Sequence, residues 1–168
     1  MRADRLGNAA AAAVCFGVLV YAIGWLQQGL GLDPCPLCVV DRLAFATAGV
    51  VFLLAALHGP GVTGGRVYAG ISLLPLALGI SSASRHVWLQ HLPENQVPAC
   101  GPGLEYILEN FPLRRALDLV LRGSGSCAEV HWRFLGLSIP EWTLTLFILL
   151  GIFALWLVFR PRAAAPRV

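Results

Sequence analysis

The residues of this 168-residue sequence whose types and spacing could do chemistry are its cysteines, at positions 15, 35, 38, 100 and 127. Cys35 and Cys38 belong to a Cys-Pro-Leu-Cys run in which Pro36 suits the first position of a helix. We therefore expect Cys35 near the helix cap and Cys38 in the first turn, where unpaired amide groups and the positive end of the helix dipole favour a thiolate. This spacing predicts a pair of reactive thiols.

A cation and a carboxylate follow the two thiols on the same predicted helix. Arg42 lies four residues after Cys38 and seven after Cys35, so the three side chains are expected on one helix face. There a permanent positive charge would favour the Cys38 thiolate and could polarise an oxygen atom of a bound ligand. Asp41 would oppose this effect unless its carboxylate turns to water or is paired.

Two other uses of the cysteines compete with redox chemistry. The first is a structural disulfide framework, for which the four cysteines outside the first helix allow three pairings. Such a framework would gain nothing from a helix start that stabilises a thiolate. The second is a zinc site of the Cys3His type, made by Cys35, Cys38, Cys127 and His131. A zinc site would leave Cys100 unused and would need thiolates that persist outside the cell, so we expect no metal.

The remaining cysteine and three histidines are expected to have no chemical role. Cys15 falls in the middle of an apolar helix, where a small thiol packs like any apolar side chain. His58, His86 and His91 are expected to lie at the membrane interface or in loops.

The composition places the chain in a membrane. Hydrophobic residues make up 57% of the sequence and charged residues 12%, with a mean hydropathy of +0.72, whereas a soluble domain carries about 25% charged residues. The same arithmetic excludes intrinsic disorder. The 12 basic residues exceed the 9 acidic ones only slightly and form no stripe or patch, which excludes a nucleic-acid partner.

Four stretches between charges are long enough to cross a bilayer, which takes about 18 to 25 mostly apolar residues. They contain 27, 23, 18 and 18 uncharged residues and lie between Arg5 and Asp33, Arg42 and Arg66, Arg66 and Arg85, and Glu141 and Arg160. The spans are predicted at about 9–26, 39–57, 67–88 and 141–159. We therefore expect an all-α membrane protein, a single domain over residues 1–168 that forms a bundle of four transmembrane helices.

The arginines predict how this bundle is oriented, because positive charge stays on the cytoplasmic side. With four spans, the segments 1–8, 58–66 and 160–168 share one face, which carries six arginines against one acid. The segment from His91 to Glu141 carries four arginines against six acids. Both termini are therefore expected in the cytoplasm, and the loops at about 27–38 and 89–140 outside it. This topology places Cys35, Cys38, Cys100 and Cys127 on the same, exterior side.

The long exterior loop is expected to carry two short amphipathic helices separated by Pro112. Their apolar residues follow helical spacing: Leu104, Ile107, Leu108 and Phe111 in the first stretch, and Leu113, Leu117, Val120 and Leu121 in the second. Packing against the top of the bundle would explain the pattern. We favour helices that lie on the lipid surface, since Tyr106 and Phe111 suit that depth.

These features together resemble the disulfide bond formation protein B (DsbB) family, the quinone-linked disulfide generators of bacterial inner membranes. The resemblance covers nearly the whole chain. It includes the four spans, Cys-Pro-Leu-Cys with Arg42, the run Arg85 to Gln90 at the end of the third span, and Cys100. It continues through Cys127 and its neighbours to the run from Trp132 to Trp142 that leads into the fourth span.

The resemblance implies a role for each of these residues in a quinone-dependent protein thiol:disulfide oxidoreductase. Cys35 with Cys38 and Cys100 with Cys127 would be two redox-active disulfides. The second would oxidise a DsbA-like thiol oxidase of the periplasm, and the electrons would reach the first through a transient Cys35–Cys127 bridge.

The resemblance also implies the final electron acceptor. Arg42 would bind a membrane quinone, ubiquinone or menaquinone, beside the Cys38 thiolate. A quinone is needed because DsbA is itself a strong oxidant that no thiol pool can reoxidise. The expected partners are thus the DsbA-like protein, membrane lipid and quinone.

Two alternatives to this interpretation remain at the level of sequence. A vitamin K epoxide reductase-like enzyme is also a small helical membrane protein with cysteine pairs, but its quinone-facing pair sits late in the chain, whereas Cys-Pro-Leu-Cys opens the second span here. The other alternative is a non-enzymatic membrane protein whose exterior loops are braced by disulfides.

Overall fold

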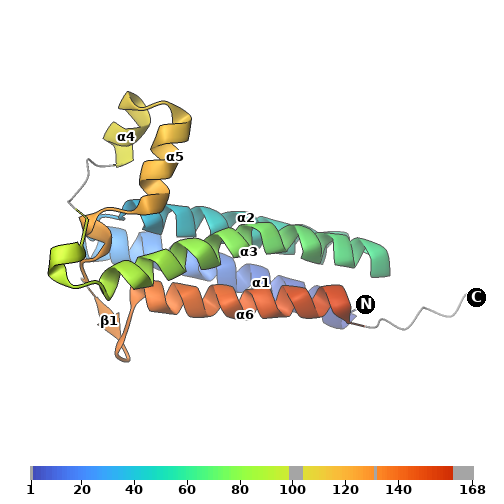
Figure 1. Ribbon diagram of the computed structural model, residues 1–168. Coiled ribbons are helices and arrows are strands. Elements are labelled where there is room, and N and C mark those ends of the chain that lie inside the picture. Colours follow the sequence, from blue (N-terminus) through green and yellow to red (C-terminus); the bar gives the residue numbers. More distant parts are fainter. Residues whose placement is uncertain (1, 99–103, 131, 161–168) are drawn as a thin grey trace, which may run out of the picture.

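The long helices of the protein lie side by side in one bundle (Figure 1). A computed structural model describes residues 2–98, 104–130 and 132–160. The bundle consists of α1 (Arg2–Val20), which continues as a π-helix (Tyr21–Gly29), α2 (Pro36–His58), α3 (Val62–Gln90) and α6 (Ile139–Phe159). Within these described residues, four helices are long and apolar enough to cross a membrane: Asp4–Gly29, Pro36–His58, Val62–Gln90 and Ile139–Phe159. The prediction of an all-α, four-helix membrane protein is confirmed.

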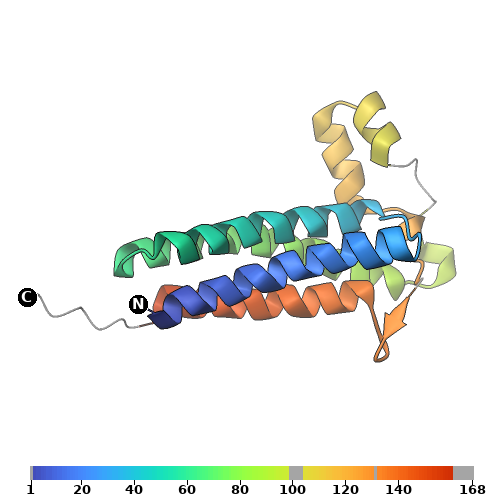
Figure 2. The same cartoon turned by 180° about the vertical axis from the view of Figure 1, so that it is seen from behind.

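Small residues let the helices approach closely, as in other membrane bundles. Helix α1 packs on α2, α2 on α3 and α3 on α6, and α1 crosses the face opposite α3 (Figure 2). In the core, the rings of Phe45 and Phe147 are stacked with centroids 4.0 Å apart. A Cβ atom on Gly79 would lie 2.5 Å from the Phe147 ring. Cys15 is fully buried in this core, as expected for a packing residue.

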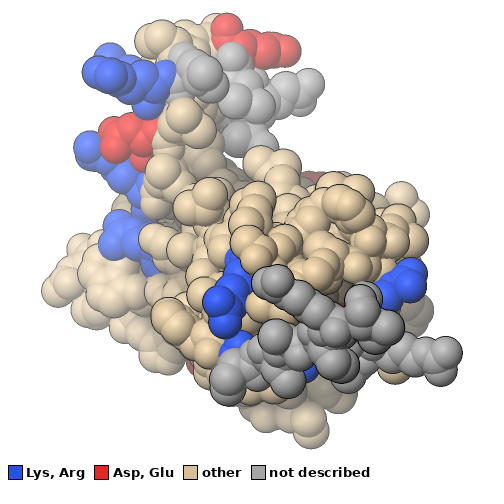
Figure 3. Space-filling view, turned by 90° about the vertical axis from the view of Figure 1, so that its right-hand side faces the viewer, with Lys and Arg blue, Asp and Glu red and all other residues tan. Residues whose placement is uncertain are grey.

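The tail end of the bundle, which holds the start of α1 and the end of α6, is closed by arginine contacts. Arg5 Nε donates to the Ala56 carbonyl oxygen over 3.0 Å, and Arg160 pairs with Asp4 at 2.8 Å. In Figure 3, which faces this end, basic side chains lie on the end face and also on the arm that projects behind it, whereas the clearly visible acidic ones lie on the arm. The visible charges of the end face are thus basic, and the arm carries charges of both signs.

The arm leaves the opposite end, the cysteine end, which holds the start of α2, the end of α3 and the start of α6. It consists of α4 (Leu104–Asn110) and α5 (Leu113–Arg122) and projects sideways from the bundle (Figures 1 and 2). Ile107, Ala116 and Val120 form a small core with Val40 of α2. Leu117 and Leu121 stay 53% and 45% exposed. The arm therefore packs on the bundle with one face and leaves apolar side chains outside, where an interfacial helix needs them.

Three short elements complete the cysteine end. A 3-10 helix, Glu94–Gln96, follows α3, and another, Gly125–Cys127, follows the arm. Strands β1 (Arg133–Phe134) and β2 (Leu137–Ser138) then pair antiparallel, Arg133 opposite Ser138, in a hairpin whose turn puts Leu135 at φ 52° and Gly136 at φ 84°. At the start of α6, the Ser138 amide donates to the Glu141 carboxylate at 2.6 Å in a capping box.

Candidate active site

The first thiol pair sits where the sequence places it, at the start of α2. Cys35 is the N-cap, with extended φ and ψ of −67° and 162°, and Pro36 begins the helix. The Cys38 amide donates to Cys35 Sγ over 3.3 Å, so the thiol of Cys35 caps an orphan amide of the first turn. The two Sγ atoms lie 3.0 Å apart. Cys35 and Cys38 can therefore exchange between a dithiol and a disulfide without moving the helix.

Cys127 reaches this pair from a segment about 90 residues further along the chain. It ends the 3-10 helix Gly125–Cys127 and is fully buried against Leu37 and Leu89. The chain returns over the helix ends at Gly123, which has φ 75° and where a Cβ atom would lie 2.7 Å from Leu89. Only glycine suits both the positive φ and the close approach, so Gly123 brings Cys127 down onto Cys35.

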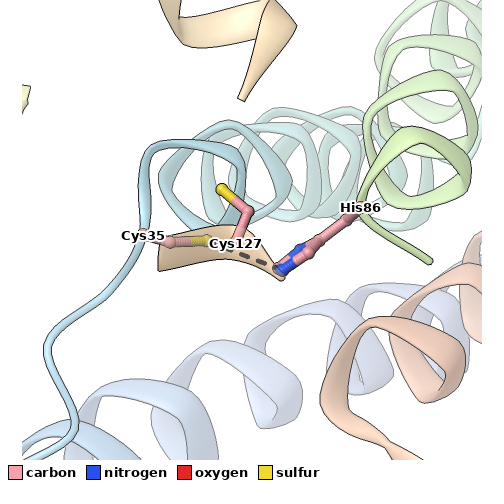
Figure 4. A group of neighbouring side chains, drawn as sticks. All are labelled: Cys35, His86 and Cys127. Carbon is pink, nitrogen blue, oxygen red and sulfur yellow. Dashed lines mark hydrogen bonds between the residues drawn. The ribbon is translucent and has the colours of Figure 1, made fainter. Parts of the chain in front are cut away.

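His86 joins the two cysteines from the end of α3, as Figure 4 shows. Its Nε2 lies 3.7 Å from Cys35 Sγ, and the ligand atoms of Cys35, His86 and Cys127 all lie within 4.8 Å of one another. The expectation that His86 is an interfacial or loop histidine is wrong, because its side chain is only 3% exposed. These three donors could hold a metal ion in the reduced protein. His131 of the zinc alternative lies outside the described residues.

The pKa values of Cys35 and Cys127 are shifted in opposite directions. A hydrogen bond from Cys35, together with the backbone around Ser124 and Leu37, lowers the pKa of Cys127 from 9.0 to about 6 against the opposing effect of burial. The same interaction raises the pKa of Cys35, because the Cys35 thiol is the donor toward Cys127. Burial raises it further, since it disfavours the charged thiolate. Cys127 is thus the more acidic thiol of the pair in the reduced protein, and a thiolate is the attacking species in disulfide exchange.

Arg42 is held by the first helix. Its Nη1 donates to Gln27 Oε1 at 2.5 Å, and its Nη2 donates to the Ala22 carbonyl oxygen at 3.2 Å. Asp41, the preceding residue, does not turn to water, because it is only 4% exposed. Its carboxylate lies beside Ser82, although its Oδ1 has no hydrogen-bond partner among the described residues. Asp41 and Arg42 line the same cavity, so a carboxylate and a cation both face that space.

A cavity of about 470 Å³ opens beside these groups, a size typical of small-molecule sites. Cys35, Cys38, Arg42 and His86 contribute to its wall. A second hollow of about 480 Å³ adjoins it and shares Ala22 and Leu26, but its wall is almost wholly apolar and includes Trp132 and Trp142. A polar chamber with a thiol and a cation thus continues into an apolar groove.

The structure brings together four of the five site residues chosen from the sequence: Cys35, Cys38, Arg42 and Cys127. Cys100 lies outside the described residues. The sequence analysis missed His86 and Gln27. The signal for His86 was its position in the Arg85 to Gln90 run at the end of a predicted span, which places it at the level of Cys35. No local pattern marks Gln27.

Comparison with known proteins decides the family. The family model "Disulfide bond formation protein DsbB" matches residues 4–157. The chain belongs to the DsbB family. Curated relatives named disulfide bond formation protein B include one from Nitrosococcus oceani, 52% identical over 145 residues that cover 86% of each chain. Others come from Hahella chejuensis, 52% identical over 89% of this chain and 93% of the relative, and Methylobacillus flagellatus, 44% identical over 96% of each.

Membership of the DsbB family identifies a disulfide bond formation protein of the membrane, a redox protein rather than a passive one with braced loops. It favours this interpretation over a vitamin K epoxide reductase-like enzyme. Within a DsbB-family chain, the contact between Cys127 and Cys35 joins the long loop to the start of α2. That contact places a thiol of the long loop beside the thiol pair of α2.

Proposed function

We propose that this DsbB-family chain is a quinone-dependent thiol:disulfide oxidoreductase. It reoxidises a DsbA-like thiol oxidase of the periplasm and passes the electrons to ubiquinone or menaquinone in the inner membrane. The observation that carries the proposal is the position of Cys127, which lies against Cys35. Cys35 in turn lines a cavity together with Cys38 and Arg42.

The exchange between the two thiol pairs follows from this position. The partner's thiolate opens a Cys100–Cys127 disulfide at Cys100 and frees Cys127 as a thiolate. Cys127 then attacks Sγ of Cys35, the bond between Cys35 and Cys127 forms, the bond between Cys35 and Cys38 breaks, and Cys38 leaves as a thiolate. The backbone around Ser124 and Leu37 lowers the pKa of Cys127 whatever the oxidation state of Cys35, which supports Cys127 as the attacking thiolate.

The cavity suits a quinone, which supplies a two-electron, two-proton acceptor when bound. Cys38 lines the chamber at the first turn of α2. Arg42 offers a fixed cation to a ligand oxygen one turn further on. The adjoining apolar groove fits a lipid-like tail. Cys38 and Arg42 are thus the electron donor and the polarising group.

The proposed orientation puts the cysteine end in the periplasm and both termini in the cytoplasm. Arginines dominate the segments at the tail end, and positive charge stays inside. On this orientation Cys35 and Cys127 face the oxidising compartment in which a soluble dithiol oxidase works.

The test uses the full chain purified in detergent with ubiquinone and a reduced DsbA-like partner, and follows quinone absorbance. We expect quinol to form in step with oxidation of the partner, Cys38→Ser to abolish both, and Cys15→Ala to leave both unchanged. Failure of the unmodified chain to form quinol, or full activity of Cys38→Ser, contradicts the proposal. Trapping of free thiols followed by peptide mapping tests the resting disulfides, expected as Cys35–Cys38 and Cys100–Cys127.

A further inference from the structure

The end of the first membrane helix departs from α-helical geometry. From Tyr21 to Gly29 the backbone forms a π-helix, in which hydrogen bonds run from residue i to residue i+5. In an α-helix of 3.6 residues per turn, residues i and i+5 lie on different faces. In the π-helix they stack one above the other, so Ala22 and Gln27 lie on one face. Such segments are rare and frequent at functional sites.

The face of the π-helix that carries Ala22 and Gln27 accepts two hydrogen bonds from Arg42. Gln27 Oε1 accepts a hydrogen bond from Arg42 Nη1 at 2.5 Å, and the Ala22 carbonyl oxygen accepts one from Nη2 at 3.2 Å. Two acceptors on two different nitrogens fix both the position and the plane of the guanidinium group, since its donors form a rigid planar fork. An α-helical register would separate the two acceptors and leave Arg42 with one of them.

Gln27 acts on the cavity only through Arg42. The cavity wall includes Ala22, Leu26 and Arg42, and Gln27 is absent from the residues that line it. Arg42 is half-buried and carries a long side chain that would otherwise sample many rotamers. Its two hydrogen bonds remove that freedom before any ligand arrives, and a group held in advance binds its ligand more tightly than a free one.

We propose that Gln27, presented by the π-helix, is the positioning residue for Arg42 and thereby sets the affinity of the cavity for quinone. The inference rests on the proposed function, because it takes Arg42 to be the group that meets the quinone oxygen. It adds the first membrane helix to a site that the sequence assigns to the second helix and the cysteine loops.

The test replaces Gln27 and uses its neighbour as a matched control. Gln28 is the same residue type, lies in the same π-helix and is exposed. We expect Gln27→Ala to raise the KM for quinone about tenfold, the effect of losing one hydrogen bond to a charged group, while kcat and oxidation of the reduced partner change little. Gln28→Ala should behave as the unmodified chain. Equal KM values for the two variants overturn the inference.

A double-mutant comparison separates positioning from general damage to the helix. In an Arg42→His background, Gln27→Ala should raise the KM no further, because the group it positions is gone. A further rise of about tenfold in that background would show that Gln27 acts independently of Arg42 and would overturn the inference. If the unmodified chain forms no quinol, the proposed function itself fails and the inference falls with it.

A spectroscopic measurement tests the contact without any quinone. A guanidinium group held by two acceptors rotates slowly about its Cζ–Nη bonds and gives separate proton resonances for its nitrogens. We expect separate Arg42 resonances in the unmodified chain and in Gln28→Ala. In Gln27→Ala they should merge into one averaged signal, because the guanidinium group rotates faster. Resonances that persist unchanged in Gln27→Ala would contradict the positioning role.

Discussion

Cys127 is the residue that would connect the two proposed thiol pairs, Cys35 with Cys38 and Cys100 with Cys127. It is fully buried against Leu37 and Leu89, and its Sγ lies within 4.8 Å of Cys35 Sγ, the sulfur it would attack. This position aims the nucleophile at its target. In the reduced protein, the neighbouring Cys35 thiol also lowers the pKa of Cys127.

We predict that Cys35 controls the pH profile of Cys127. In a chain carrying Cys15→Ala, Cys38→Ser and Cys100→Ser, alkylation of Cys127 should be fast at neutral pH and fall as pH drops through about 6, where the thiolate takes up its proton. Adding Cys35→Ala removes the largest cause of the low pKa, so the profile should shift to higher pH. Rates of iodoacetamide labelling measure both profiles, and coincident profiles would contradict the assignment.

Arg42 should govern quinone use and leave partner recognition alone. We predict that Arg42→His raises the apparent KM for quinone about tenfold, the order expected for a lost hydrogen bond from a charged donor, and changes the KM for the reduced partner much less. Steady-state kinetics with each substrate varied in turn measure the two effects. Arg66→His, at the other end of the bundle, is the control. Equal effects on both substrates would remove Arg42 from the quinone site.

The sequence could predict the residues of the site that are local to one another. Cys35, Cys38 and Arg42 are related by helical spacing, and a proline marks where the helix begins, so their common face follows from local geometry alone. His86 and Gln27 become neighbours of these residues only through the packing of α3 and α1 against α2. No spacing within one segment encodes that packing, and both residues were missed.

Among the elements, α3 and α6 meet closely at Gly79. Gly79 faces the ring of Phe147, which is fully buried and stacked on Phe45, so the ring has no free volume into which it could withdraw. The glycine is therefore part of the contact surface between two membrane helices.

We predict that Gly79→Ala destabilises the bundle by about 1–3 kcal/mol, the usual cost of overpacking a tight core. Gly70→Ala in the same helix is the matched control, because a Cβ atom there meets nothing within 4 Å. Thermal unfolding in detergent, followed by circular dichroism, measures the difference. A Gly79→Ala variant as stable as Gly70→Ala would show that the helices separate freely at this point.

Charge gaps were sufficient to place the membrane helices, and helical spacing was sufficient to place α4 and α5, because both signals are properties of contiguous sequence. The π-helix was not predictable in the same way. Its extra residue per turn leaves no mark on hydropathy, and what favours it in the structure is a contact with Arg42, 15 residues beyond Gln27. The exposed face of α5 likewise depends on where α2 lies.

The whole molecule separates its functions along the bundle axis. Reactive thiols, cavity and arm lie at the cysteine end, and arginine contacts close the tail end. In the proposed function, electrons therefore travel only across one end of the bundle, between the cysteine loops and the cavity.

We predict that the two ends face opposite compartments. In a chain whose five native cysteines are replaced by serine or alanine, Leu135→Cys at the hairpin tip should react with an impermeant maleimide added to intact spheroplasts. Gly61→Cys, in the turn between α2 and α3 at the tail end, should react only after the membrane is opened. Both positions are exposed, so the difference reports sidedness. Labelling of Gly61→Cys in intact cells would reverse the proposed topology.

The return of the chain at Gly123 also bears on how this molecule could change over evolutionary time. The segment from His91 to Arg122 leaves from the end of α3 and comes back to it, since Gly123 contacts Leu89 and Arg85 Nε donates to the Arg122 carbonyl oxygen over 3.3 Å. A loop whose ends already meet tolerates changes in length at small entropic cost. The segment carries Cys100 and leaves Cys127 with the bundle, so its length can change over evolution without moving Cys127 away from Cys35.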